Sequence, residues 1–121
     1  MDENEIAIKK FQKELNSGIA SLVLLGVLAN SKEPLYGYQI ARQIGAGKAE
    51  GLSMKQGALY PVLRSLEKSN LLESYVEPSV SAPPRRYYRI TLTGTEAFKQ
   101  WRTTWEQTRD FVDATLKGME Q

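Results

Sequence analysis

The chain has 121 residues, a hydrophobic fraction of 41% and a formal net charge of only +2, from 16 lysines and arginines against 14 acidic residues. This length permits one domain with a small core, and chains of this kind often gain stability by burying surface between protomers. Because the sequence contains no cysteine and no histidine, disulfides, thiolate metal sites and histidine-based catalysis are excluded, and neither a cofactor nor a metal is expected.

The N-terminal part of the chain predicts two helices. Residues 1–5 are acidic, unlike a signal peptide, and no apolar run approaches the roughly 18 residues of a membrane span, so a cytoplasmic protein is expected. Residues 2–16 show an amphipathic helical pattern with a narrow apolar stripe that includes Ile8 and Phe11. Residues 18–30 are apolar nearly all round, which is typical of a buried helix.

Two further helices are expected in the middle of the chain. Residues 35–44 predict a short helix with Tyr36 at its start and Tyr38 packed beside it. After a connection punctuated by glycines, residues 54–69 predict a third helix that begins at the capping box Ser53-Met54-Lys55-Gln56. The apolar stripe of this third helix consists of Leu59, Val62, Leu63 and Leu66.

A hairpin and a long helix complete the pattern. Asn70 is expected to close the third helix in a left-handed conformation, and residues 72–77 and 86–91 predict two strands joined by a proline-rich tip. Thr93-x-x-Glu96 is a second capping box, which opens a helix that reaches about Lys117. This order predicts a winged helix-turn-helix, mainly α with a small β-hairpin.

The expected division of the chain follows from these elements. Residues 1–16 form an N-terminal arm helix, residues 17–92 the winged helix-turn-helix domain, and residues 93–121 a long C-terminal dimerisation helix. The last helix overshoots a domain of this size, so it is expected to pack against a second chain.

Three blocks of the sequence resemble one known family. The blocks LYGYQI (35–40), GALYPVLRSLE (57–67) and PPRRYYRIT (83–91) are similar, in this order and spacing, to the PadR family of bacterial transcriptional regulators. The resemblance implies a homodimeric winged-helix repressor that dimerises through its last helix with help from the N-terminal region. The length is similar to that of the branch with one short C-terminal helix, which includes multidrug-responsive repressors. Ser81 and Ala82 stand at the wing tip where glycines are common in the family.

The residues expected to contact DNA lie on the third helix, at the start of the second and at the base of the wing. They are Tyr36, Ser53, Lys55, Gln56, Tyr60, Arg64, Lys68, Arg85 and Arg86. Tyr36 is included because the resemblance implies that its block abuts DNA. Side chains near the start of a reading helix reach bases, whereas Arg64 and Lys68 come later and are expected near the phosphate backbone. Arg85 and Arg86 either hold phosphates or enter the minor groove. The alternative is that these groups form the solvated face of a packed helix and hairpin.

The last helix and the arm helix carry the expected dimer interface. Its residues are Ile8, Phe11, Phe98, Trp101, Trp105, Thr108, Val112 and Leu116, of which those on the last helix follow a heptad-like seam. Trp105 is also the expected effector-binding residue, because paired indoles can sandwich a planar molecule. Members of the resembling family bind flat, lipophilic drugs through a tryptophan on this helix. The alternative for Trp105 is a dry interface anchor.

These observations predict a sequence-specific transcriptional regulator. The expected form is a homodimeric repressor that binds a roughly palindromic, double-stranded operator and is relieved by a planar aromatic or lipophilic effector. The alternative is a winged-helix module that docks a partner protein without binding DNA directly. An enzyme is not expected, because no nucleophile–base pair can be drawn from the residues present.

Overall fold

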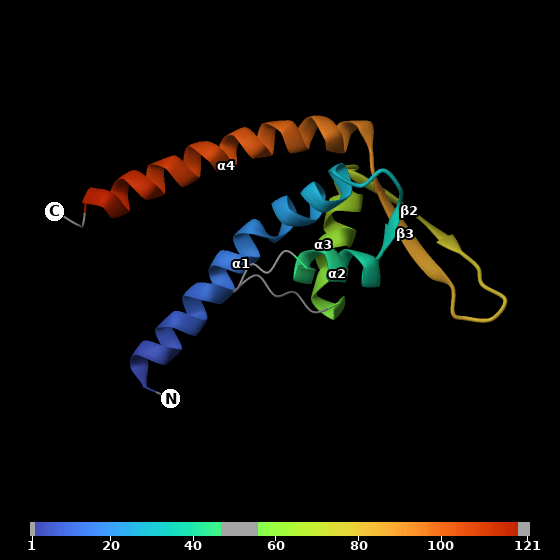
Figure 1. Cartoon of the computed structure of the whole chain (residues 1–121), viewed down its shortest axis with the longest axis horizontal. Helices are drawn as coiled ribbons and strands as arrows, with labels where there is room; N and C mark the ends of the chain where they lie inside the picture. The colour runs from blue at the N-terminus through green and yellow to red at the C-terminus, as the bar shows by residue number, and fades with distance from the viewer. Residues whose placement is uncertain (1, 47–55, 119–121) are drawn as a thin grey trace.

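The computed structural model describes residues 2–46 and 56–118, which form four helices and a small three-stranded sheet (Figure 1). In chain order the elements are α1 (Glu3–Ala29), β1 (Leu35–Tyr36), α2 (Gly37–Ala46), α3 (Gln56–Lys68), β2 (Leu72–Glu77), β3 (Arg85–Ile90) and α4 (Leu92–Gly118). The predicted mainly helical fold with a hairpin wing is confirmed. In these two ranges, no helix is both long and apolar enough to cross a membrane.

The N-terminal part of the chain forms one helix, so the prediction of two separate helices was wrong. Asp2 caps α1 by accepting a hydrogen bond from the backbone N–H of Glu5 at 2.8 Å, and the helix then continues past Gly18. A glycine inside a helix costs about 1 kcal/mol relative to alanine, which lowers stability without ending the helix. Of the arm expected over residues 1–16, residues 3–16 are therefore the largely exposed first half of α1 (Figure 1).

The core lies where the second half of α1, α2, α3 and the sheet meet. Its fully buried side chains include Leu24, Leu28, Ile40, Leu59, Leu63, Leu72 and Tyr88. On α3, the apolar stripe predicted from the sequence points into this core, with Leu59, Leu63 and Leu66 buried and Val62 partly buried. This packing holds α3 against the sheet and leaves its other side exposed.

The sheet has the strand order β1-β3-β2, with both pairs antiparallel. Its first strand, Leu35–Tyr36, was not expected, because these two residues were predicted to begin a helix. They pair instead with Tyr88 and Tyr87 of β3, a long-range contact that a local pattern cannot indicate. Alternate residues face opposite sides of a sheet. Tyr88 therefore points into the core, and Tyr87 lies on the outer face.

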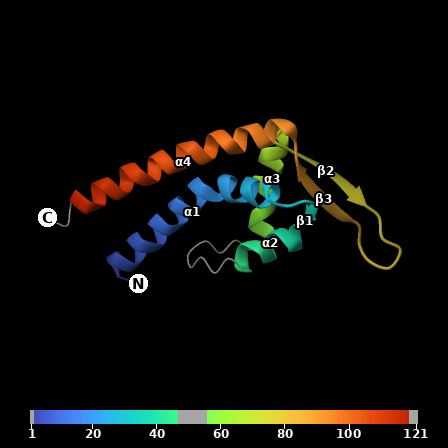
Figure 2. The ribbon, with the colours of Figure 1, turned by 45° about the horizontal axis from the view of Figure 1, so that its top comes forward.

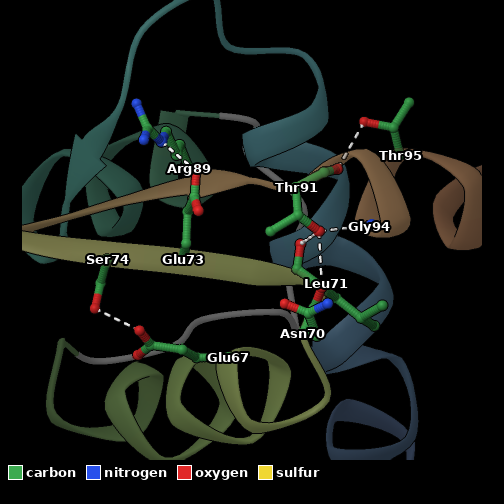
Figure 3. A network of polar contacts seen from close by, with 9 residues as sticks. All are labelled: Glu67, Asn70, Leu71, Glu73, Ser74, Arg89, Thr91, Gly94 and Thr95. Atoms are coloured by element: carbon green, nitrogen blue, oxygen red, sulfur yellow. Dashed lines mark hydrogen bonds and ion pairs between the residues drawn. The ribbon is translucent and has the colours of Figure 1, made fainter.

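Thr91 connects the hairpin to α4 (Figure 3). Its hydroxyl donates to the carbonyl of Asn70 at 2.7 Å and accepts from the backbone N–H of Gly94 at 2.9 Å. Thr91 therefore caps α4, and the prediction that Thr93 would do so was wrong because the helix already begins at Leu92. Asn70 has φ 62°, which confirms the predicted left-handed end of α3.

The first half of α4 crosses α1, where Phe98 packs on Gly26. A Cβ on Gly26 would lie 3.1 Å from the Phe98 ring, so the absence of a side chain permits this close crossing. Beyond the crossing, the N-terminal end of α1 and the C-terminal end of α4 project on the side opposite the wing (Figures 1 and 2). Both projecting ends carry exposed apolar side chains, among them Phe11, Val112 and Leu116.

Candidate functional site

Four of the predicted DNA-contacting residues meet around one cleft at the base of the wing. The cleft has a volume of about 270 Å³ and lies between the start of α2, the middle of α3 and the chain that enters β3. We call it the notch; its lining residues are Tyr36, Gly37, Tyr60, Ala82, Pro83, Pro84, Arg85 and Arg86. Phenol and guanidinium groups from three separate segments are thus brought together.

The position of Arg85 is fixed by an aromatic ring. The guanidinium carbon of Arg85 lies 4.6 Å from the centroid of the Tyr36 ring, within the range of a cation–π contact. The rings of Tyr36 and Tyr87 meet edge to face with their centroids 5.4 Å apart, and the ring of Tyr87 stacks on that of Tyr75 with a centroid distance of 5.6 Å. This row of tyrosines crosses all three strands on the outer face of the sheet. It holds a solvent-exposed cation beside the start of α2.

The start of α2 is stabilised by contacts between residues that are close together in the sequence. The backbone N–H of Tyr36 donates to the side-chain oxygen of Gln39 at 3.1 Å, and Gly37 is buried where the chain turns from β1 into the helix. Tyr38, which was expected to pack inside, is 51% exposed, so that prediction was wrong. The Tyr38 ring points outward from the first turn of α2 and stacks loosely on the Tyr36 ring, with the two ring centroids 6.4 Å apart.

The remaining predicted DNA contacts belong to α3 and the segment before it. Arg64 and Lys68 are exposed on the side of α3 that faces away from the core, and Tyr60 is partly buried at the core edge. Ser53 and Lys55 lie outside the described residues, and Gln56 is placed only as the first residue of α3. The cations of α3 and of the wing base are therefore all on exposed surface.

Arg86 differs from its neighbour. It lines the notch, but its Nη1 donates a hydrogen bond to the Ser74 hydroxyl at 3.0 Å. The Ser74 hydroxyl donates in turn to Glu67 at 2.7 Å (Figure 3). From the sequence, Arg85 and Arg86 were expected to play equivalent roles, and no role was predicted for Ser74. The alternation of side chains along a strand was the available signal that consecutive arginines face opposite sides.

The predicted dimer residues fall into two groups. Phe98 and Trp101 pack against the core of their own chain, so their apolar surface is already partly covered. The other six are exposed, and those on α4 follow one another along the half that extends beyond the domain: Ile8, Phe11, Trp105, Thr108, Val112 and Leu116. We call Trp105, Thr108, Val112 and Leu116 the α4 face. Trp105, which lies at the end of the α4 face nearest the domain, is 38% exposed.

Trp105 also borders a groove between α1 and α4. The groove has a volume of about 730 Å³ and is lined mainly by apolar side chains of both helices, including Leu15, Ile19, Leu22 and Trp101. Its α1 wall was not predicted, because residues 18–30 read as a helix buried all round. Since α4 crosses only part of α1, the side chains before the crossing keep an open apolar surface beside the indole.

Comparison with known proteins places these features in one family. Residues 24–100 match the transcriptional regulator PadR-like family, which is more than half of the chain. A PadR family transcriptional regulator from Eggerthella lenta superposes with a TM-score of 0.79 at 28% identity, covering 93% of this chain and 95% of that one. A transcriptional regulator from Clostridium thermocellum gives a TM-score of 0.72 at 29% identity, covering 84% and 93%. A Lysinibacillus sphaericus protein is 28% identical over 100 residues, which are 83% of this chain and 89% of that protein.

The chain therefore belongs to the PadR-like family of transcriptional regulators. The resemblance of its three sequence blocks is confirmed, and so is the winged-helix fold that it implied. Members of the family are transcriptional regulators rather than enzymes, in agreement with the expectation from the sequence.

Proposed function

We propose that this regulator binds double-stranded operator DNA through α3, the start of α2 and the wing. The observation that carries the proposal is the notch, where Tyr36, Tyr60 and Arg85 converge from three separate segments. Guanidinium and phenol groups donate hydrogen bonds to phosphate oxygens, and such contacts set the register of a protein on the duplex. A domain that collects these donors at one exposed cleft is suited to holding a phosphate.

In this mode of binding, different residues of the DNA-facing surface contact different features of the duplex. The start of α3 reads base edges in the major groove, which assigns Ser53, Lys55 and Gln56 to the sequence-specific part of the contact. Arg64 and Lys68 follow on the exposed side of α3 and lie near the backbone. The notch takes a phosphate beside the same groove. The protein then acts in the cytoplasm, where its operator is.

We further propose that the regulator is a homodimer joined through the α4 face and the exposed stripe of α1. The support is the exposed apolar surface of both projecting helix ends, including Phe11, Trp105, Val112 and Leu116. A two-fold axis places two copies of α3 about one helical turn apart on DNA, so the operator is roughly palindromic. Bound in this way, the dimer represses transcription by excluding the polymerase.

The phosphate contact is tested by substituting Arg85. Arg85→Ala is expected to weaken binding to selected and unrelated duplexes by similar factors. It also makes the plot of log K against log salt shallower by about one unit for each bound protomer. The measurement is a fluorescence titration at several salt concentrations, with a duplex that the wild-type protein selects from a random pool.

Arg89→Ala is the matched control for this titration. It removes the same charge from the same face of β3, but Arg89 is paired with Glu73 at 2.5 Å and lies outside the lining of the notch. We expect its salt dependence to stay close to that of the wild type. Equal salt slopes for Arg85→Ala and the wild type would contradict the phosphate contact.

The groove beside Trp105 supports an effector site for planar aromatic or lipophilic molecules. An indole at the edge of an apolar groove offers a flat surface on which such a molecule can stack. To relieve repression, the effector has to bind the DNA-free arrangement more tightly, and DNA then weakens effector binding by the same factor.

This effector site is tested with a planar cationic dye. The dye is expected to quench tryptophan emission in the wild type, because it stacks on the indole of Trp105. Trp105→Ala should abolish the saturable quenching, whereas Trp101→Ala should weaken it less, since Trp101 lines the same groove but also packs against the core. Saturable quenching that survives Trp105→Ala would overturn the assignment.

A further inference from the structure

The two consecutive arginines of β3 are held in different ways. Arg85 faces the outer side of the sheet, where it lies over the Tyr36 ring. Arg86 is one residue further along the strand and therefore faces the inner side, toward α3. There its guanidinium donates to the Ser74 hydroxyl of the neighbouring strand. Arg85 therefore contacts an aromatic ring, whereas Arg86 is hydrogen-bonded to a polar side chain of β2.

The bond to Ser74 is one link of a chain that joins three elements. The Ser74 hydroxyl has one proton, which it donates to Oε2 of Glu67 at 2.7 Å, and it accepts from Arg86 at 3.0 Å. Glu67 belongs to the last turn of α3, Ser74 to β2 and Arg86 to β3. An accepted bond from a cation strengthens the donation of the same hydroxyl to a carboxylate. We call this chain the Glu67–Ser74–Arg86 link.

The link sits over a buried residue of the core. Ser74 is the cross-strand partner of Tyr88, whose side chain is buried. Burial raises the pKa of Tyr88, Arg86 opposes that rise and Glu67 adds to it, so both charged groups act on this phenol. The link therefore covers the place where α3 packs against the wing, at the edge between core and solvent.

We infer that Arg86 is a positioning residue, which acts through Ser74 and Glu67 to fix the angle between the reading helix α3 and the wing. The inference rests on the proposed DNA binding and gives the two arginines different roles in it. Arg85 contacts a phosphate, and Arg86 keeps α3 and the wing in a fixed relative orientation. α3 and the wing engage different features of the duplex, the groove and the backbone. A fixed angle lets both engage at once, so loosening it weakens the specific complex more than the non-specific one.

The test compares salt dependence and specificity in five proteins: the wild type, Arg85→Ala, Arg86→Ala, Ser74→Ala and the control Arg89→Ala. Each is titrated with the selected duplex and with a scrambled duplex of equal length. Arg86→Ala and Ser74→Ala are both expected to reduce the preference for the selected duplex by about three- to tenfold, the effect of losing one hydrogen bond. Their salt slopes are expected to stay close to that of Arg89→Ala, whereas Arg85→Ala flattens the slope.

Two further comparisons show whether Arg86 acts through its partners. The double variant Ser74→Ala/Arg86→Ala should lose no more specificity than the worse single variant, because both substitutions break the same link. At position 67, Gln retains an acceptor for Ser74, and Met has a similar shape without one. Glu67→Gln should therefore keep the specificity that Glu67→Met loses, although both remove the same charge. Thermal melting of each variant checks that it is folded.

The outcomes separate this inference from the proposed function. If Arg86→Ala flattens the salt slope as much as Arg85→Ala and Ser74→Ala has no effect, Arg86 is a phosphate contact and the inference is overturned while DNA binding stands. Additive losses in the double variant, or equal behaviour of Glu67→Gln and Glu67→Met, also overturn it. If the wild type itself binds no duplex in a salt-dependent manner, the proposed function fails, and the inference fails with it.

Discussion

Gly94→Ala is expected to lower the free energy of unfolding by about 3 kcal/mol and the melting temperature by roughly 10 °C. Gly94 is buried in the first turn of α4, directly beneath the backbone carbonyl of Leu71. An added Cβ would overlap that carbonyl and lie 2.7 Å from Cγ1 of Ile90. The carbonyl cannot move aside easily, because it accepts from the backbone N–H of Thr91 at 3.0 Å. The measurement is thermal melting followed by circular dichroism.

Gly18→Ala is the matched control for this substitution. Gly18 lies in the middle of α1, with nothing within 4 Å of an added Cβ. Alanine there should raise stability by about 0.5–1 kcal/mol, because it removes conformational freedom from the unfolded chain and favours the helix. A Gly94→Ala protein that melts within one or two degrees of the wild type, by the same measurement, would contradict the tight junction between the hairpin and α4.

Val112→Asp is expected to convert the proposed dimer into single chains and to reduce affinity for the selected duplex by about 100-fold or more. Val112 lies in the centre of the α4 face and is 45% exposed in the single chain. A carboxylate buried against a second apolar helix would lose its hydration without gaining a partner. Once the chains separate, the two half-sites are no longer bound by linked domains. Light scattering gives the mass, and a gel-shift titration gives the affinity.

Gln107→Asp controls for the added charge, because Gln107 is exposed on the opposite side of α4 from Val112. It should leave the mass at two chains and the affinity within about a factor of three, since exposed substitutions away from an interface have small effects. A Val112→Asp protein that retains the two-chain mass would show that the chains associate through another surface. A wild-type protein with the mass of one chain at micromolar concentration would remove the dimer altogether.

The parts of the fold that could be predicted are those with strong local patterns. The stripe of Leu59, Leu63 and Leu66 indicated α3 because a helix of this period has one apolar face. The apolar row and length of the last segment indicated α4 in the same way. The left-handed end of α3 could be predicted at Asn70, since asparagine tolerates that conformation better than other residues with a Cβ.

The failures share a physical cause, which is that the deciding contact is distant in the sequence. Leu35 and Tyr36 form a strand only because β3 lies beside them. Thr91 rather than Thr93 caps α4. The hydroxyl of Thr91 is held in place because it donates to the backbone carbonyls of Asn70 and Leu71, which lie about 20 residues earlier in the chain. The continuity of α1 through Gly18 is decided by the packing of its second half on the core.

The same distinction applies to the candidate site. Tyr60 and Arg85 could be chosen from residue type and position, and Tyr36 from the family resemblance; the fold brings all three to one cleft. The role of Arg86 could not, because it depends on the register of β2 against β3, which places Ser74 next to it on the inner face. The hairpin tip of residues 78–84 is long enough to permit more than one register.

The most direct test of the account is a hydroxyl-radical footprint of the wild-type protein on a duplex that it selects from a random pool. Two reading helices held on a two-fold axis predict two protected segments of related sequence, with centres about one helical turn apart, roughly 34 Å. Arg85→Ala should reduce the protection of both segments to the same extent. A single protected segment, or uniform cleavage at protein concentrations where the wild type is dimeric, would contradict the account and favour a winged helix that binds a partner protein instead.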